Sequence, residues 1–257
     1  MSFFKETNSS ILLIGVGNLG EALLDGMLKK GLNVTALVHS EEKAIKLNEF
    51  YPSLKVEIAK KSIDIDGRTV ILAVKPNSFY DIRFEGRAKL FVSVMAKVYI
   101  DDLKSSVDSD TYIRAMPNLA ARCEKSVTAV TGSHAAKAEA LALFESIGKS
   151  VWVDSEDELN IATALAGSAP AFLALVAEAL TDGAVRAGLK RGVAEEMTKG
   201  LFDGFGALLE GSHPAKIKEE VMSPKGTTAA GIFELEKDGV RASFMKAIEA
   251  AYLKASK

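Results

Sequence analysis

The sequence has a single cysteine, Cys123, among its 257 residues. One cysteine excludes an internal disulfide framework, and this fits a reducing compartment. The formal net charge is only −2, which argues against a nucleic acid or an anionic membrane surface as the main partner. Residues 1–10 lack the apolar run of a signal peptide. We therefore expect a cytoplasmic protein that binds neither nucleic acid nor membrane, and we expect no metal site.

Long apolar runs are also scarce. Residues 161–177 form the one segment that is apolar enough to be considered as a membrane-spanning helix. The run is at the short limit for a spanning helix. It is interrupted by Ser168, Ala169 and Pro170, and Glu178 and Asp182 follow it. A helix that is apolar on all sides is also typical of a buried core or a subunit interface. We prefer a helix of a buried core or subunit interface to a membrane span. An interface helix predicts at least a homodimer.

A turn rich in glycine follows the first apolar segment of the chain. Residues 11–14 are all apolar and predict a buried strand, and the next residues have the spacing G-x-G-x-x-G. After the last glycine the apolar period becomes that of a helix. A strand, this turn and a helix together favour a dinucleotide site, with the pyrophosphate at the helix N-terminus. The expected cofactor-binding residues of this turn are Gly15, Gly17, Asn18, Leu19 and Gly20.

The end of the second predicted strand, residues 33–38, bears on the choice between NAD and NADP. An acidic residue there accepts a hydrogen bond from the ribose of NAD, whereas a neutral or basic residue accommodates the phosphate of NADP. The chain has His39 and Ser40 at this point, followed by Glu41 and Glu42. The pattern favours NADP, although Ser40 also fits the N-cap of the following helix. Both roles are compatible.

Further strands alternate with helices up to about residue 154. Parallel strands of this kind bind ligands at their carboxyl ends. The residues expected to line the nicotinamide side follow two such strands, and they are Ala73, Val74, Lys75, Pro76 and Asn118. The alternation predicts an α/β protein with a Rossmann-type, doubly wound, mainly parallel sheet. We assign residues 1–154 to this dinucleotide-binding domain.

The sequence pattern changes at Ser155. Ser155 and Glu158 have the spacing of a capping box, which predicts the N-terminus of a helix. No convincing strand follows it. Residues 155–257 are therefore expected to form an all-helical C-terminal domain for substrate binding and dimerisation. The predicted helices are 156–166, 169–188, 192–210, 214–222, 227–238 and 240–255.

Five segments together resemble the pyrroline-5-carboxylate reductase family. Their residues occur in the family's order and cover nearly the whole chain: 14–20, 73–76, 114–118, 164–171 and 223–231. The most specific is the last, Ser-Pro-x-Gly-Thr-Thr. The resemblance implies a reductase of proline biosynthesis, in which NAD(P)H delivers a hydride to the imine carbon of Δ1-pyrroline-5-carboxylate. It places Ser223, Gly226, Thr227 and Thr228 at the substrate, with Ser223 and Thr228 as catalytic residues and the Thr228 hydroxyl near the imine nitrogen.

Elementary chemistry agrees with part of this assignment, because consecutive backbone N–H groups at the start of a helix bind a carboxylate. The chain also departs from the family pattern. Lys225 replaces a glycine of the last segment, and Met95 and Lys97 stand where small residues are common. Two alternatives therefore stay open. One is a β-hydroxyacid-type dehydrogenase, although residues 155–189 lack the lysine of that family, and the other is a catalytically weak, regulatory NADP-binding paralogue.

Overall fold

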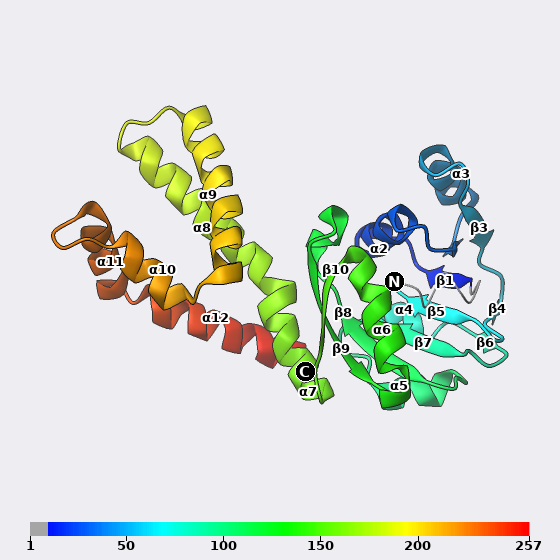
Figure 1. Ribbon diagram of the computed structural model, residues 1–257. Helices are drawn as coiled ribbons and strands as arrows, with labels where there is room; N and C mark the ends of the chain where they lie inside the picture. The colour runs from blue at the N-terminus through cyan, green and yellow to red at the C-terminus, as the bar shows by residue number, and fades with distance from the viewer. Residues whose placement is uncertain (1–9, 257) are drawn as a thin grey trace. The chain divides into compact units, whose positions relative to one another are not determined.

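A computed structural model describes residues 10–256, and these form two compact units (Figure 1). Within the described part, the first unit comprises residues 10–167 and 251–256, and the second comprises residues 168–250. The boundary between the two compact units therefore lies after Gly167, later in the chain than the change of sequence pattern at Ser155. The first helix after that point, α7 (Glu156–Ala162), belongs to the first unit.

The first unit is built on one eight-stranded sheet with the order β10-β9-β8-β7-β5-β1-β2-β3. All neighbouring strands are parallel except β8 and β9, which are antiparallel. This confirms the Rossmann-type, mainly parallel sheet. A second, two-stranded sheet joins β4 (Ile63–Asp64) and β6 (Phe84–Glu85). The strands of the main sheet are β1 (Ile11–Ile14), β2 (Val34–Val38), β3 (Lys55–Ile58), β5 (Thr69–Leu72), β7 (Leu90–Ser93), β8 (Tyr112–Met116), β9 (Ser126–Gly132) and β10 (Gly148–Trp152).

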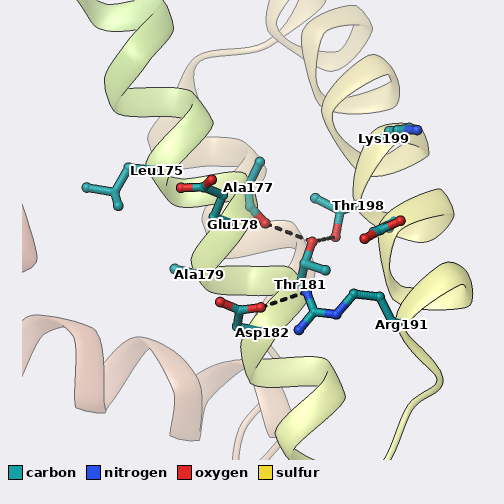
Figure 2. A pocket seen from close by; sticks show the side chains of 10 residues that line it. Leu175, Ala177, Glu178, Ala179, Thr181, Asp182, Arg191, Thr198 and Lys199 are labelled. Carbon is teal, nitrogen blue, oxygen red and sulfur yellow. Dashed lines mark hydrogen bonds and ion pairs between the residues drawn. The ribbon is translucent and has the colours of Figure 1, made fainter.

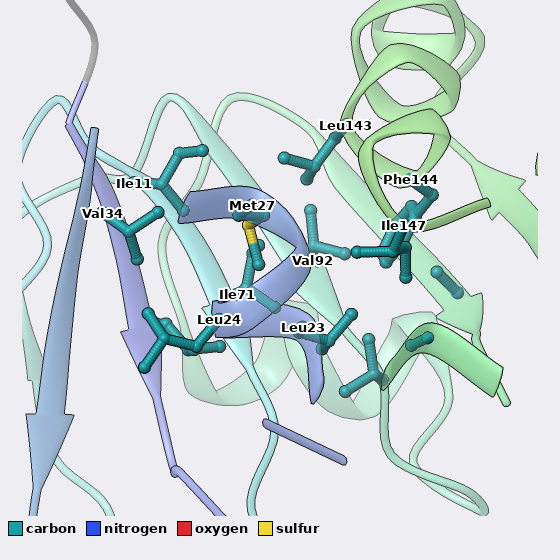
Figure 3. Close-up of a cluster of buried hydrophobic side chains, with 14 of the residues drawn as sticks. Ile11, Leu23, Leu24, Met27, Val34, Ile71, Val92, Leu143, Phe144 and Ile147 are labelled. Atoms are coloured by element: carbon teal, nitrogen blue, oxygen red, sulfur yellow. The ribbon is translucent and has the colours of Figure 1, made fainter. Parts of the chain in front are cut away.

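Helices cover both faces of this sheet, so its central strands are apolar on both sides. In β1 the side chains of Ile11 and Leu13 join one buried cluster, and those of Leu12 and Ile14 join another. Figure 3 shows the first cluster, in which Met27 of α2 packs with residues from several strands. Helices α2 (Asn18–Lys29), α3 (Glu41–Phe50) and α6 (Lys137–Phe144) contribute to the first cluster, and α4 (Pro76–Phe79) and α5 (Ile100–Ser106) contribute to the second.

One uninterrupted helical run leads out of the first unit. After α7 the residues Thr163–Ser168 form a π-helix, and α8 begins directly at Ala169. The sequence predicted two separate helices here. The N-cap prediction was nearly right: Ser155 Oγ accepts from the N–H of Glu158 at 3.1 Å, but the Glu158 carboxylate accepts from the N–H of Asp154 at 2.9 Å.

The second unit is entirely helical within the described residues, as expected. Its helices bury few side chains within this chain: Thr181 in α8, Ala194 in α9 and Ile217 in α10. Figure 1 shows α8 and α9 as a helical hairpin. The helices are α8 (Ala169–Arg186), α9 (Arg191–Gly211), α10 (Pro214–Val221), α11 (Thr227–Lys237) and α12 (Val240–Ala255), the last of which ends in the first unit.

The run Glu156–Arg186 is long and apolar enough to cross a membrane, by length and composition alone. Its mean hydropathy reaches 1.7, and 17% of that window is buried within the chain. A core within one chain therefore does not account for this helix, and the other expected environment, a subunit interface, stays a prediction. A membrane and a subunit interface both fit exposed apolar residues of this kind.

Candidate active site

A pocket of about 350 Å³ lies at the edge of the main sheet where β1, β2 and β5 end. Many of the residues expected to bind the cofactor line it together, although they come from three separate segments. They are Gly15, Gly17, His39, Ser40, Ala73, Val74 and Lys75. The carboxyl ends of parallel strands are where such folds bind dinucleotides.

The turn after β1 depends on two glycines that have no room for a side chain. Gly15 has φ +91°, and a Cβ there would lie 2.7 Å from the carbonyl oxygen of Ala73. A Cβ on Gly20 would lie 2.1 Å from the carbonyl oxygen of Gly15. Gly20 therefore lets the first turn of α2 pack directly on the glycine turn, as the spacing predicts.

Gly17 is different, because its backbone needs no glycine. It is the N-cap of α2 with φ −82° and ψ −164°, and a Cβ there would meet nothing within 4 Å. Its side of the turn opens into the pocket. The first N–H groups of α2 lie beside it, and they carry the positive end of the helix dipole. This arrangement leaves space for a phosphate to approach the backbone, so the residues fit a dinucleotide.

The end of the pocket near β2 is lined by His39, Ser40 and Lys43. Ser40 is the N-cap of α3, and its Oγ accepts from the N–H of Lys43 at 3.3 Å. His39 is exposed beside it. Lys43 also lines the pocket, and its Nζ lies 3.3 Å from Glu21 Oε2. We did not single out Lys43 from the sequence, but the signal was present as a basic residue in the first turn after the strand end that lacks an acid.

Other expected cofactor residues lie outside the lining of this pocket. Asn18 begins α2 and borders a separate hollow beside Tyr51. Leu19 packs against the first buried cluster, and Pro76 is the first residue of α4. Asn118 uses its side-chain amide to hydrogen-bond within the protein, as described below.

The residues expected at the substrate lie in the second unit, in the loop that leads into α11. The N–H of Gly226 donates to the carbonyl of Ser223 at 3.0 Å, which closes a turn. Lys225 has φ +59° in the third position of this turn, where a glycine is favoured. A Cβ on Gly226 would lie 2.3 Å from Ser223 Oγ.

Gly226 is the N-cap of α11, so Thr227 and Thr228 provide its first N–H groups. Within residues 10–256, neither the Ser223 nor the Thr228 hydroxyl has a side-chain hydrogen bond. The loop therefore presents backbone N–H groups and hydroxyls beside one another, and such a set can bind a carboxylate.

Two residues that depart from the family pattern follow β7 and have different environments. Met95 is buried in the second cluster, so its side chain belongs to the core. Lys97 is exposed and has φ +63°. The positive φ at Lys97 and Lys225 shows that both lysines occupy backbone conformations that suit glycine.

A larger hollow, of about 720 Å³, lies between α8 and α9 (Figure 2). Thr181 Oγ1 lies 2.9 Å from Thr198 Oγ1, and Arg191 pairs with Asp182 at 2.8 Å. The hollow contains none of the residues expected at the active site. In residues 10–256, no group of three or more His, Cys, Asp or Glu side chains is arranged to hold a metal ion.

Two family models match separate segments of the chain. A family model described as pyrroline-5-carboxylate reductase dimerisation matches residues 156–257. A second model, described as NADP oxidoreductase coenzyme F420-dependent, matches residues 10–97. The helical region that buries little of its own surface is thus similar to a dimerisation domain.

Relatives cover nearly the whole chain. The pyrroline-5-carboxylate reductase of Helicobacter pylori is 37% identical over 241 residues, which is 91% of this chain and 94% of the relative. The enzyme of Thermus thermophilus is 35% identical over 252 residues, covering 94% and 95%. The solved structure of the Streptococcus pyogenes enzyme is 29% identical and covers 96% of this chain and 98% of its own, with a TM-score of 0.82. This chain belongs to the pyrroline-5-carboxylate reductase family.

Proposed function

We propose that this protein reduces Δ1-pyrroline-5-carboxylate to L-proline, with NADPH as the preferred hydride donor. The observation that carries the proposal is the nearly full-length match to reductases of this name at 37% and 35% identity. The match includes both the pocket at the sheet edge and the loop before α11. It favours this reaction over that of a β-hydroxyacid-type dehydrogenase.

The bound nicotinamide would supply the hydride, and the chain's own residues would hold and orient both reactants. The turn at Gly15 and Gly17 and the N-terminus of α2 would bind the pyrophosphate, because the N–H groups there lack helical partners. Ala73, Val74 and Lys75 line the same pocket beyond this turn. We propose that they contact the ribose and nicotinamide, as their place at the end of β5 suggests.

The substrate carboxylate would lie at the N-terminus of α11. Thr227 and Thr228 offer backbone N–H groups there, and the turn that Gly226 closes with Ser223 sets their direction. We propose that the Thr228 hydroxyl hydrogen-bonds the imine nitrogen and helps to keep it protonated, since the iminium is the better acceptor of hydride. This loop would thereby fix the reacting carbon in near-attack geometry.

The preference for NADPH is supported by the charge near β2. No acid follows that strand directly, whereas His39, Ser40 and Lys43 border the pocket. A phosphate on the ribose would accept charge-assisted hydrogen bonds from such groups. We expect Lys43→Gln to raise KM for NADPH about tenfold and to leave KM for NADH nearly unchanged. Lys46→Gln is the control, because Lys46 lies on the same helix but does not line the pocket. Equal losses with both cofactors would contradict this assignment.

The deciding experiment is a steady-state assay with pyrroline-5-carboxylate and either NADPH or NADH. We expect L-proline to form in proportion to the NADPH oxidised, with a higher kcat/KM than for NADH. If NADPH binds to the protein but no proline forms, the chain is a silent NADP-binding paralogue and the proposed reaction is wrong.

We also propose a cytoplasmic homodimer that associates through the helices of the second unit. The support is their exposed apolar surface, which includes Leu175, Met197 and Phe233 at 65%, 64% and 66% exposure. Patches of this kind mark association surfaces, and the dimerisation model covers them. Sedimentation at micromolar concentration should give at least a dimer without detergent. A monomer, or a requirement for detergent, would overturn the proposal.

A further inference from the structure

Asn118 forms an internal hydrogen bond across 48 residues of sequence. The residue follows β8 and is the N-cap of the short 3₁₀ helix Leu119–Cys123. Its Oδ1 accepts from the N–H of Ala120 at 3.1 Å, and its own N–H donates to Ser126 Oγ at 3.1 Å. The first bond fixes the side-chain amide, so that its NH₂ group points away from the cap, and the second fixes the backbone of Asn118. That NH₂ group donates to the carbonyl oxygen of Ala166 at 3.0 Å.

The carbonyl of Ala166 lies four residues before Pro170. In an α-helix this carbonyl would accept from the N–H four residues later, which is residue 170. Proline has no N–H, so Pro170 cannot donate to the Ala166 carbonyl as an α-helical residue would. Ala166 lies within the π-helix Thr163–Ser168, a form that is uncommon and often found at functional sites. The Asn118 amide therefore donates to a carbonyl that Pro170 cannot serve.

We propose that Asn118 is a positioning residue that fixes the helical segment joining the two units, by replacing the N–H that Pro170 lacks. The first unit passes into the second after Gly167, within this segment. The first unit carries the cofactor pocket and the second carries the loop at Ser223–Thr228. Resting on the proposed reduction of pyrroline-5-carboxylate, the inference assigns Asn118 to the turnover step and not to cofactor affinity.

The test variant is Asn118→Asp, which keeps the acceptor for the N–H of Ala120 but has no donor for Ala166. Asn48→Asp is the matched control, because it adds the same charge at an exposed position of α3. We expect Asn118→Asp to lower kcat about tenfold, as for the loss of one hydrogen bond to a half-buried carbonyl. The Kd for NADPH, measured by titration of the enzyme without substrate, should stay within about twofold. The control should leave both values unchanged.

Pro170→Ala provides the rescue, because alanine returns an N–H to the helix at the position that Ala166 needs. In the Pro170→Ala background, Asn118→Asp should lower kcat much less than it does in the wild type. Equal losses in both backgrounds would overturn the proposal, and so would a rise in the Kd for NADPH that matches the loss of kcat. The second result would make Asn118 a cofactor-binding residue instead.

Hydrogen exchange gives a readout that does not need the reaction. Amides of residues 163–172 should exchange faster in Asn118→Asp, and the rate should return toward that of the parent in the double variant. Unchanged exchange refutes the inference even if the enzyme is active. A wild type that forms no proline but shows this exchange pattern refutes the proposed function and leaves the positioning role in place.

Discussion

Replacing Gly17 with alanine should separate the stability of the protein from its affinity for the cofactor. The backbone of Gly17 has φ −82° and ψ −164°, which alanine adopts without strain, and an added Cβ meets nothing within 4 Å. Alanine also restricts the unfolded chain, which stabilises the folded form by about 0.4–1 kcal/mol. The melting temperature of the cofactor-free protein should therefore rise by roughly 1–4 °C.

The same methyl group lies where the pyrophosphate would approach the turn. We expect the Kd for NADPH to rise at least about tenfold, which corresponds to about 1.4 kcal/mol. At a concentration of NADPH about 100 times the wild-type Kd, binding stabilises the wild type by about 2.7 kcal/mol. A tenfold weaker variant gains only about 1.4 kcal/mol at that concentration. The order of stability should thus invert: the variant is more stable without NADPH and less stable with it.

Thermal melts with and without NADPH, together with calorimetric titration, measure both quantities. Gly20→Ala is the contrasting variant, because its Cβ would lie 2.1 Å from the carbonyl oxygen of Gly15. That variant should lose about 1–3 kcal/mol even without cofactor, since backbone has to move. If NADPH stabilises Gly17→Ala as much as the wild type, Gly17 does not face the cofactor and the reasoning is refuted.

Three further substitutions test other parts of the molecule. Lys225→Gly should raise the free energy of unfolding by up to about 1 kcal/mol, because φ +59° disfavours a side chain; a loss in chemical denaturation would contradict this. Thr228→Ala should lower kcat far more than it weakens NADPH binding, and equal effects would refute its role at the imine. Gly26→Ala should destabilise the protein by about 1–3 kcal/mol, since its Cβ would lie 2.3 Å from Cγ2 of the fully buried Ile147. The folded Gly26→Ala variant should bind NADPH with the same Kd as the wild type, and a changed Kd would argue against a purely packing effect.

The sheet was predictable because its strands are short apolar runs between helices of clear period. Residues 11–14 and 69–72 are buried on both faces, so their sequence alone limits them to the centre of a parallel sheet. The direction of β9 was not predictable in the same way. Its antiparallel pairing with β8 places Ile113 opposite Gly132, and a pairing of that kind depends on long-range packing that no local pattern encodes.

The candidate site was likewise predictable only where local sequence determines it. Glycines at 15 and 20 were predictable from spacing, because a Cβ on Gly20 would meet Gly15 within the motif and the turn at Gly15 needs a positive φ. The hydrogen bond of Asn118 joins two segments far apart in sequence, and neither local pattern indicates it. Lys43 was missed because its helix was interpreted through the capping of Ser40, whereas its place in the pocket depends on where β1, β2 and β5 end together.

The proposed association surface and the proposed substrate site both lie in the helical unit, and one physical cause connects them. Helix α8 buries only Thr181 within this chain, and α11 buries no residue. Apolar residues such as Leu175 and Phe233 stay exposed at 65% and 66%, so the burial that stabilises these helices has to come from outside the chain. The loop at Ser223–Thr228 precedes α11, and hydride transfer tolerates only small displacements of the reacting atoms. We expect a loop on helices with so little internal packing to be held less closely in one copy than in an assembly of two. Association of two copies would therefore be needed to order the substrate site as well as to cover the apolar surface.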